Sequence, residues 1–267
     1  MSYATKDIRN IALLGHGGNG KSSLVESMLY LTGAIDRLGS TAAGNSVSDY
    51  DAEEIKRHIS ISASTMYVEY QKAKINVIDT PGYFDFAGEV VQALRVADTG
   101  IICVSAKDGL NVGAEKAWKS LSDANLPRAI YISKIDEENS DYYTSLHKLQ
   151  KQFGVSVAPI VVPIFEGNRD TVGIVDCVIR KAYRMEGNKR VEIPIPDNMK
   201  DRIDQHRAAL CENVAELSEE LMERFVRGDS ARSSEGSGLG LNIAGSLVEL
   251  QGGEFRLFVD GDLFKAE

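Results

Sequence analysis

Eight consecutive residues near the N-terminus have the types and spacing needed to bind a phosphate. The run from Gly15 to Ser22, GHGGNGKS, fits the pattern GxxxxGK[ST] and lies between an apolar run and a stretch with helical periodicity. Glycines let a loop turn its backbone N–H groups toward a phosphate, and the helix N-terminus adds partial positive charge. Lys21 would supply a full charge, and Ser22 an oxygen for Mg²⁺. The alternative is a glycine-rich loop with an exposed lysine; we predict instead a nucleotide phosphate site formed by Gly17, Gly18, Asn19, Gly20, Lys21, Ser22 and Ser23.

A second motif, Asp79-Thr80-Pro81-Gly82, follows the apolar run KINVID, 58 residues after Lys21 (79 − 21). Alone it is weak, because Pro-Gly is foremost a turn signal. If KINVID is a neighbouring strand of the same sheet, Asp79 could hold the magnesium through a water. The Gly82 amide could then face the terminal phosphate. Together, the two motifs indicate a nucleotide-binding site more specifically than either motif does alone.

A third motif, Ser133-Lys134-Ile135-Asp136, ends the run AIYISKID, 54 residues beyond Asp79 (133 − 79). The Asp136 carboxylate could accept hydrogen bonds from both the N1–H and the 2-amino group of guanine, a pair that adenine does not offer. A solvated charge cluster at a strand end is an equal alternative for this motif in isolation. As the third motif in order, it predicts a guanine site formed by Ser133, Lys134 and Asp136.

The pattern of residues 8–162 predicts the elements that position these motifs. Short aliphatic runs, IRNIALLG, KINVIDT, TGIICVSA and RAIYISK, alternate with amphipathic stretches such as SSLVESMLYLTGA, AGEVVQALRVAD and VGAEKAWKSLSDAN. This alternation is typical of a doubly wound α/β domain with a mainly parallel sheet. Ligands of such sheets bind beyond the carboxyl ends of the strands, where all three motifs fall.

The pattern changes after residue 162. Strand-like pieces, VGIVDCVIRKAYRM and KRVEIPIP, are separated by a turn at Gly187-Asn188, and a charged helix is predicted over 198–225. A glycine- and serine-rich loop, a helix (LNIAGSLVELQGG) and a strand (EFRLFVDGD) follow. We therefore expect three parts: a nucleotide-binding domain over 1–162, an inserted α+β subdomain over 163–225, and a C-terminal helix–strand segment over 226–267.

Composition narrows the class of protein. The chain has 267 residues, 43% of them hydrophobic, a net charge of 30 − 39 = −9 and a pI near 5.1, so it should fold and should not bind duplex nucleic acid directly. The N-terminus has no apolar signal core, and no run reaches about 18 apolar residues, so we expect a cytoplasmic protein away from membranes. Three widely spaced cysteines, Cys103, Cys177 and Cys211, are expected to be buried core residues.

Residues 1 to about 225 resemble the GTPase domain of elongation factor G and the related ribosomal-protection translational GTPases. The three motifs carry the resemblance, together with the segments EEIKRHISISAS, YFDFAGEVVQALRVADTGIICVSAKDG and ELMERF. It implies a P-loop NTPase fold, binding of GTP or GDP with Mg²⁺, and activation by the ribosome. It also implies a first switch at residues 57–60 and a second at 79–83. Ser60, where the family usually has threonine, would then complete the magnesium site with Ser22 and Asp79.

Two departures from this family bear on catalysis and specificity. The histidine that usually follows the second motif and orients the attacking water is Tyr83 here. A phenol is a poor base near neutral pH, so hydrolysis involving Lys21, Gly82 and Tyr83 should be slow. Ser133 replaces an asparagine, which should loosen the guanine site. A GTP-binding or ribosome-interacting module that does not hydrolyse GTP remains the alternative.

The C-terminal segment, about 223–265, resembles the end of a sensor histidine kinase ATPase domain. Phe225 would belong to its phenylalanine box and the run GSGLGL, residues 236–241, to its last glycine box. The abrupt change suggests a chimera of two gene fragments. No upstream asparagine box is present for the magnesium of ATP, so an ATP-binding kinase fragment is only a third alternative.

The elongation factor resemblance also stops before that family's final strand and last guanine-contacting loop, which predicts lower stability and weaker guanine binding.

Overall fold

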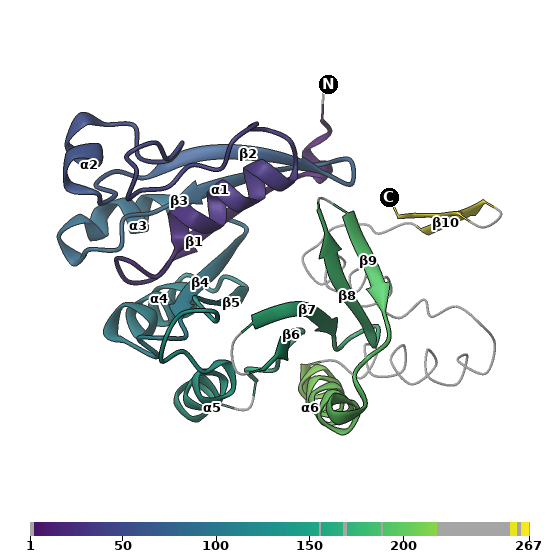
Figure 1. The fold of residues 1–267 in the computed structure, drawn as a ribbon. Helices are drawn as coiled ribbons and strands as arrows, with labels where there is room; N and C mark the ends of the chain where they lie inside the picture. The colour runs from purple at the N-terminus through teal and green to yellow at the C-terminus, as the bar shows by residue number, and fades with distance from the viewer. Residues whose placement is uncertain are drawn as a thin grey trace. The chain divides into compact units, whose positions relative to one another are not determined.

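The computed structural model describes residues 3–154, 156–167, 170–187, 189–217, 257–260 and 263–266. The chain divides into two compact units, Met1–Lys148 and Leu149–Glu267 (Figure 1). All three motifs lie in the first unit.

The first unit is built on a five-stranded sheet with the order β2-β3-β1-β4-β5. The strand β1 pairs in parallel with β3 on one side and with β4 on the other, and β4 pairs in parallel with β5. Only the edge strand β2 is antiparallel to its neighbour. This sheet confirms the predicted mainly parallel α/β fold; its strands are β1 (Ile8–Leu14), β2 (Ser64–Tyr70), β3 (Ala73–Asp79), β4 (Thr99–Ser105) and β5 (Arg128–Ser133).

Helices connect these strands, and the three predicted after the β1, β3 and β4 runs are confirmed. Their starts have local causes: Asn111 caps α4 by accepting a hydrogen bond from the Ala114 amide, and Asp51 with Glu54 forms a capping box on the short α2. The helical segments of the first unit are η1 (Thr5–Asp7), α1 (Lys21–Leu31), α2 (Ala52–Arg57), η2 (Phe84–Phe86), α3 (Ala87–Leu94) and α4 (Val112–Asp123). The helix α5 (Tyr142–Phe153) begins in the first unit and ends in the second.

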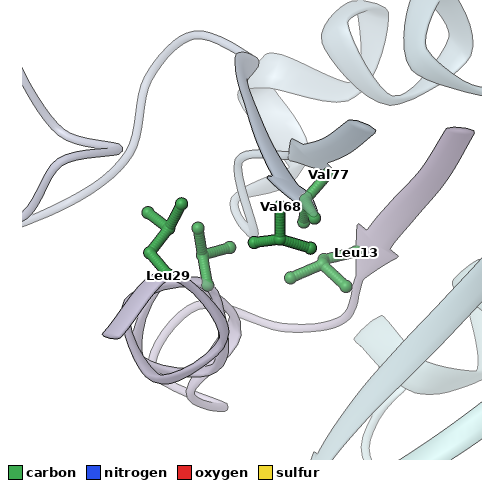
Figure 2. Close-up of a cluster of buried hydrophobic side chains, with 5 residues drawn as sticks. Leu13, Leu29, Val68 and Val77 are labelled. Carbon is green, nitrogen blue, oxygen red and sulfur yellow. The ribbon is translucent and has the colours of Figure 1, made fainter. Parts of the chain in front are cut away.

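A buried apolar cluster holds α1 against the sheet (Figure 2). Val25 and Leu29 of α1 pack with Leu13 of β1, Val68 of β2 and Val77 of β3. Complete burial of such a side chain contributes roughly 1.5–3 kcal/mol relative to its exposed form. The cluster therefore keeps the N-terminus of α1 directly beyond the carboxyl end of β1.

The second unit contains a four-stranded antiparallel sheet with the order β6-β7-β8-β9. The run VGIVDCVIRKAYRM does not form one strand, because a turn at 177–180 divides it into β7 and β8. The Asp176 carboxylate accepts hydrogen bonds from the Val178 and Ile179 amides and stabilises that turn. The elements are β6 (Val161–Glu166), β7 (Asp170–Asp176), β8 (Lys181–Glu186), β9 (Lys189–Ile193), η3 (Asp197–Met199) and α6 (Lys200–Leu217).

Near the C-terminus, β10 (Leu257–Asp260) and β11 (Leu263–Ala266) form an antiparallel pair. The predicted loop and helix between residues 226 and 253 lie outside the described residues. Cys103 and Cys177 are buried as expected, whereas Cys211 on α6 is partly exposed. Among the described helices, none combines the length and the apolarity that a membrane span requires.

Candidate nucleotide-binding site

The three motifs meet at one edge of the first sheet, beyond the carboxyl ends of β1, β3 and β5. The Thr80 hydroxyl donates a hydrogen bond of 2.6 Å to the Leu13 carbonyl, which ties the second motif to the end of β1. The Ser133 hydroxyl donates one of 2.8 Å to the Asn19 carbonyl, which ties the third motif to the first. The parallel strand order therefore brings together segments that are far apart in the chain.

The loop from Gly15 to Gly20 has the backbone conformation that its glycines allow. Gly15, Gly18 and Gly20 have φ angles of 133°, 79° and 83°, which side-chain-bearing residues rarely adopt. A Cβ on Gly15 would also lie 2.5 Å from the Cys103 carbonyl oxygen. Gly20 is the N-cap of α1 and supplies no capping side chain, so the first amides of the helix remain available to an anion.

Lys21, the first residue of α1, extends over this loop. Its ammonium donates hydrogen bonds of 3.1 Å to both the Gly15 and the His16 carbonyls, and the side chain is buried. Burial lowers the pKa of the Lys21 ammonium, and the charge of Asp79 opposes this. A buried ammonium that bonds to backbone carbonyls is suited to bind an anion.

Asp79, the last residue of β3, is 1% exposed. Neither of its carboxylate oxygens meets hydrogen-bond geometry with any group of the described residues. Burial raises the pKa of the Asp79 carboxyl to about 6, and the nearby Ser22 hydroxyl and the Lys21 ammonium only partly oppose this. A buried, ionised carboxylate without hydrogen bonds destabilises the fold unless a cation or a cation-bound water lies beside it. The site therefore fits a hydrated Mg²⁺.

The other two predicted magnesium residues also meet here. The hydroxyl oxygens of Ser22 and Ser60 are 3.4 Å apart. Ser60 donates a hydrogen bond of 2.7 Å to the buried carboxylate of Asp49, and Thr41 donates one of 3.0 Å to the other oxygen. No sequence signal points to Asp49, because it lies in a polar stretch with no motif. Its role depends on hydrogen bonds from Thr41, 8 residues before it, and from Ser60, 11 residues after it.

Glu26 fixes the segment before Asp49 to α1. This glutamate lies one helical turn after Ser22 and is 1% exposed. Its carboxylate accepts hydrogen bonds from the Gly39 amide (2.8 Å), the Ser46 hydroxyl (3.2 Å) and the Val47 amide (2.5 Å). The helix that carries the phosphate-binding loop is thus joined directly to residues 39–47.

Glu54 holds the segment around Ser60 in a similar way. It is 2% exposed, and one of its oxygens accepts hydrogen bonds from the Ile61 and Ser62 amides at 2.9 and 3.0 Å. His58, the C-cap that follows α2, has a φ of 55°, and its Nδ1 lies 2.9 Å from the Thr41 carbonyl oxygen. These contacts place Ser60 beside Ser22.

The predicted catalytic residues Lys21, Gly82 and Tyr83 lie together at the phosphate-binding loop. A Cβ on Gly82 would be 2.4 Å from the Gly17 nitrogen and 2.6 Å from the Lys21 ammonium. The backbone of the second motif therefore packs directly on the loop. The Tyr83 side chain is partly exposed beside Gly17.

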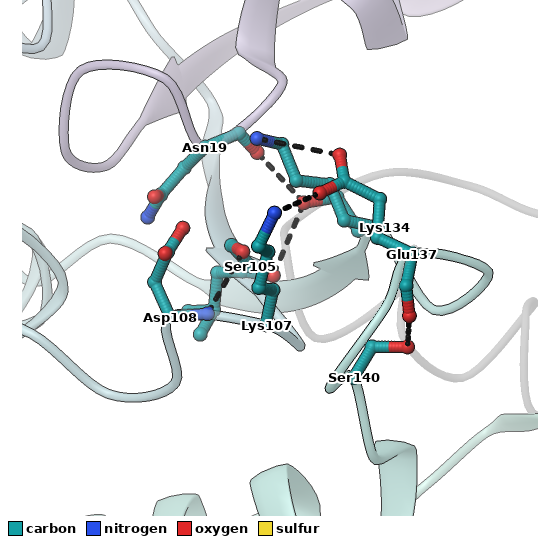
Figure 3. A network of polar contacts seen from close by, with 9 residues as sticks. Asn19, Ser105, Lys107, Asp108, Lys134, Glu137 and Ser140 are labelled. Carbon is teal, nitrogen blue, oxygen red and sulfur yellow. Dashed lines mark hydrogen bonds and ion pairs between the residues drawn. The ribbon is translucent and has the colours of Figure 1, made fainter.

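The third motif forms a polar network with the phosphate-binding loop (Figure 3). The Ser133 hydroxyl donates to the Asn19 carbonyl. The Asn19 side chain in turn donates a hydrogen bond of 2.9 Å to the Cys103 carbonyl. The Lys134 ammonium lies 3.6 Å from Glu137, which also pairs with Lys107 at 3.0 Å.

Two guanine-site residues differ in exposure. Asp136 is exposed, as a residue that meets a base must be before binding. Ser133 is buried, and its hydroxyl lies within hydrogen-bond distance of two backbone carbonyls. No role for Glu137 at this site was predicted from the sequence. Its position directly after Asp136, in an acidic run, was the signal that could have indicated one.

Comparisons with known proteins match most of the chain. The model of the elongation factor Tu GTP binding domain matches residues 6–249. Elongation factor G of Mycoplasma pneumoniae is 35% identical over 225 residues, which are 83% of this chain and 33% of the relative. An elongation factor G-like protein of Mycobacterium tuberculosis is 32% identical over 229 residues, 85% of this chain and 31% of the relative.

A solved structure of a Thermus thermophilus protein aligns with a TM-score of 0.77 and 34% identity, covering 84% of this chain and 33% of that one. The chain thus spans about a third of the length of the relatives that it matches. The family model extends to residue 249, into the segment that resembles a sensor histidine kinase, and none of these matches supports that part of the interpretation.

Proposed function

The chain belongs to the family of the elongation factor Tu GTP-binding domain, and from that premise we propose that it binds GTP and GDP with Mg²⁺ and hydrolyses GTP slowly. One observation carries the proposal. The buried carboxylate of Asp79 has no hydrogen-bond partner among the described residues and lies beside Ser22 and Lys21, at the point where the phosphate-binding loop meets the second motif. A magnesium-bound triphosphate would satisfy all of these groups at once.

The phosphates would be bound by Lys21 and by the backbone amides of residues 17–23. The Gly82 amide would contact the terminal phosphate, because the Gly82 backbone already lies against the loop. Ser22 and Ser60 would ligate the magnesium directly, with Asp79 behind a bound water. When bound, the magnesium neutralises charge that develops on the phosphate oxygens.

Hydrolysis would proceed by attack of a water oxygen on the γ-phosphorus. The bond from that phosphorus to the β–γ bridging oxygen breaks, GDP leaves with the electron pair, and the water proton ends on the phosphate. Tyr83 would orient the water by a hydrogen bond. An unperturbed phenol has a pKa near 10, so the rate would depend on positioning and charge stabilisation rather than on a strong base.

Guanine would be recognised by Asp136, with Lys134 beside the base. Ser133 would contribute through its bond to the Asn19 carbonyl rather than through the base. Because the matched relatives include elongation factor G, we propose the ribosome as the activating partner and the cytoplasm as the site of action.

Tyr83 also favours a second candidate, a GTP-binding module that does not hydrolyse GTP. Equilibrium binding of GTP, GDP and ATP with magnesium tests the shared part of both proposals. We expect both guanine nucleotides to bind and ATP to compete poorly. If the folded protein binds neither GDP nor GTP at millimolar concentration, both candidate functions are refuted.

Single-turnover phosphate release, with and without ribosomes, separates the two candidates. Release that Lys21→Ala abolishes supports the GTPase. GTP binding without any release, even with ribosomes, supports the second candidate.

A further inference from the structure

The carboxylate of Glu137 pairs with two lysines at once, one at each of its oxygens (Figure 3). Its Oε2 lies 3.0 Å from the Lys107 ammonium, and its Oε1 lies 3.6 Å from the Lys134 ammonium. Lys107 follows β4, whereas Lys134 belongs to the third motif, directly after β5. Glu137 therefore joins the turn after β4 to the proposed guanine site.

Hydrogen bonds hold the backbone on both sides of this ionic bridge. In the turn after β4, the Ser105 hydroxyl accepts a hydrogen bond of 3.1 Å from the Asp108 amide. After β5, the Ser140 hydroxyl lies within hydrogen-bond distance of the Ile135 and Glu137 carbonyls, at 2.8 and 2.6 Å. The backbone that carries the carboxylate is thus restrained, and the bridge acts mainly on the lysine side chains.

Lys134 is the lysine of this bridge that would lie beside guanine. Its backbone φ of 55° is in the left-handed region, and its side chain is 32% exposed. A lysine side chain has many rotamers, and ordering them when a ligand binds reduces affinity. A partner that holds the Lys134 ammonium before the nucleotide arrives removes part of this loss.

The charges of the bridge support one another. The hydrogen bond with Lys107 holds the pKa of Glu137 below its usual range, and it raises the pKa of Lys107. Both groups are therefore charged at neutral pH. A single exposed ion pair contributes little, but a carboxylate shared by two lysines forms a network. The alternative is an exposed charge cluster with no part in binding, and the two interpretations predict different nucleotide affinities.

We propose that Glu137 is a positioning residue for Lys134 and thereby helps to set the affinity for guanine nucleotides. Lys107 anchors Glu137 from the β4 side, and Glu137 holds the Lys134 ammonium so that this side chain borders the base. Ser133 bonds to the Asn19 carbonyl instead and leaves this task to the bridge. The inference rests on the proposed guanine-nucleotide binding and adds two residues to it.

A double-mutant cycle tests this role. The single variants are Glu137→Gln, Lys134→Met and Lys107→Met, and Glu137→Gln is also combined with each lysine substitution. Glu138→Gln is the matched control, because it removes the next carboxylate, which is exposed, and changes the net charge equally. For each variant we would measure the unfolding midpoint and the equilibrium affinity for GDP and for inosine diphosphate.

We expect Glu137→Gln to weaken GDP binding by about three- to tenfold, because it removes both ion pairs of an exposed network. Lys107→Met should weaken it in the same direction and by a smaller factor. In the Lys134→Met background, Glu137→Gln should have no further effect. The difference between wild type and Glu137→Gln should also shrink at about 1 M salt, where the Debye length is about 3 Å.

Inosine diphosphate separates an effect through Lys134 from one through Asp136. Inosine lacks the 2-amino group from which the Asp136 carboxylate would accept a hydrogen bond. If Glu137 acts through Lys134, Glu137→Gln should weaken both nucleotides by the same factor. A larger loss for GDP would show that Glu137 acts on Asp136 and would overturn the proposal.

Three other results would overturn it: unchanged or tighter GDP binding in Glu137→Gln, an equal loss in Glu138→Gln, or additive effects of Glu137→Gln and Lys134→Met. The Lys107→Met cycle decides the matter if Lys134→Met binds too weakly to measure, because it leaves the lysine beside the base in place. Additive effects of Glu137→Gln and Lys107→Met would then contradict the bridge.

Failure of the proposed function gives a different result. If folded wild-type protein binds neither GDP nor inosine diphosphate, the nucleotide site is refuted and the role of Glu137 with it. If wild type binds GDP and Glu137→Gln binds it equally well, only the role of Glu137 is refuted.

Discussion

The Ser133 hydroxyl donates a hydrogen bond of 2.8 Å to the Asn19 carbonyl and thereby joins the end of β5 to the phosphate-binding loop. A serine hydroxyl has one proton, so a serine that donates it to a backbone carbonyl cannot also donate it to a base. At this position the serine therefore supports the loop, and we expect recognition of guanine to depend on Asp136.

Ser133→Ala should destabilise the protein, because the buried Asn19 carbonyl loses its donor. An unsatisfied buried group costs about 1–3 kcal/mol, and we expect a loss of that order in the free energy of unfolding. Urea denaturation measures it. Ser27→Ala, which removes a hydroxyl that bonds within α1, is the matched control and should stay within about 0.5 kcal/mol of wild type. Equal losses in the two variants would contradict the role of Ser133.

Asp136→Ala should weaken GDP binding by about 10- to 100-fold, because hydrogen bonds to a charged group contribute about 1.5–3 kcal/mol. ATP affinity should not fall in parallel. Isothermal titration with both nucleotides measures the change in specificity. Asp123→Ala removes another exposed carboxylate, at the end of α4, and should leave GDP affinity unchanged. If GDP binds Asp136→Ala as tightly as it binds wild type, Asp136 does not read the base.

The raised pKa of Asp79 predicts how stability depends on pH in the nucleotide-free, magnesium-free protein. The folded pKa of about 6 exceeds the unfolded value of about 3.9, so between these values the folded state binds more protons. Stability should therefore fall as pH rises from about 4 to 6, by up to about 3 kcal/mol from this group. Urea unfolding of wild type and Asp79→Asn across this range isolates the contribution.

Asp79→Asn should lack this fall and should be more stable than wild type at pH 7 without ligand. It should also gain less stability from magnesium and GDP, because the carboxylate that faces the hydrated ion is gone. Identical pH profiles for the two proteins would show that Asp79 is not desolvated as the structure indicates.

Glu26→Ala should release residues 39–47 from α1. The Gly39 and Val47 amides lose their acceptor and would turn to water, so their hydrogen exchange should accelerate by about tenfold or more, since each lost hydrogen bond to a charged group is worth about 1.5–3 kcal/mol. Glu53→Ala removes an exposed carboxylate paired with Arg57 and serves as the control. Unchanged exchange at both amides in Glu26→Ala would contradict this attachment.

Local patterns were enough to predict much of this molecule. Alternating apolar runs placed β1, β3, β4 and β5, and Gly15 to Ser22 indicated a turn between β1 and α1. These features depend on side-chain periodicity and on glycine backbone freedom, which are properties of neighbouring residues. The division of residues 172–185 into β7 and β8 was not predicted, because its turn contains neither glycine nor proline and relies on Asp176.

The sequence by itself determined the chemistry available at the site: a lysine and a serine at the start of a helix, an aspartate at the end of β3, and a carboxylate at position 136. Only the tertiary structure decided which groups meet. Asp49 bonds to Ser60, Ser133 supports Asn19, and Tyr83 lies on Gly17 because the sheet order and the folding of residues 33–63 bring them together. Such pairings depend on how the fold places segments that are far apart in the chain. A local pattern of residue types therefore cannot predict them.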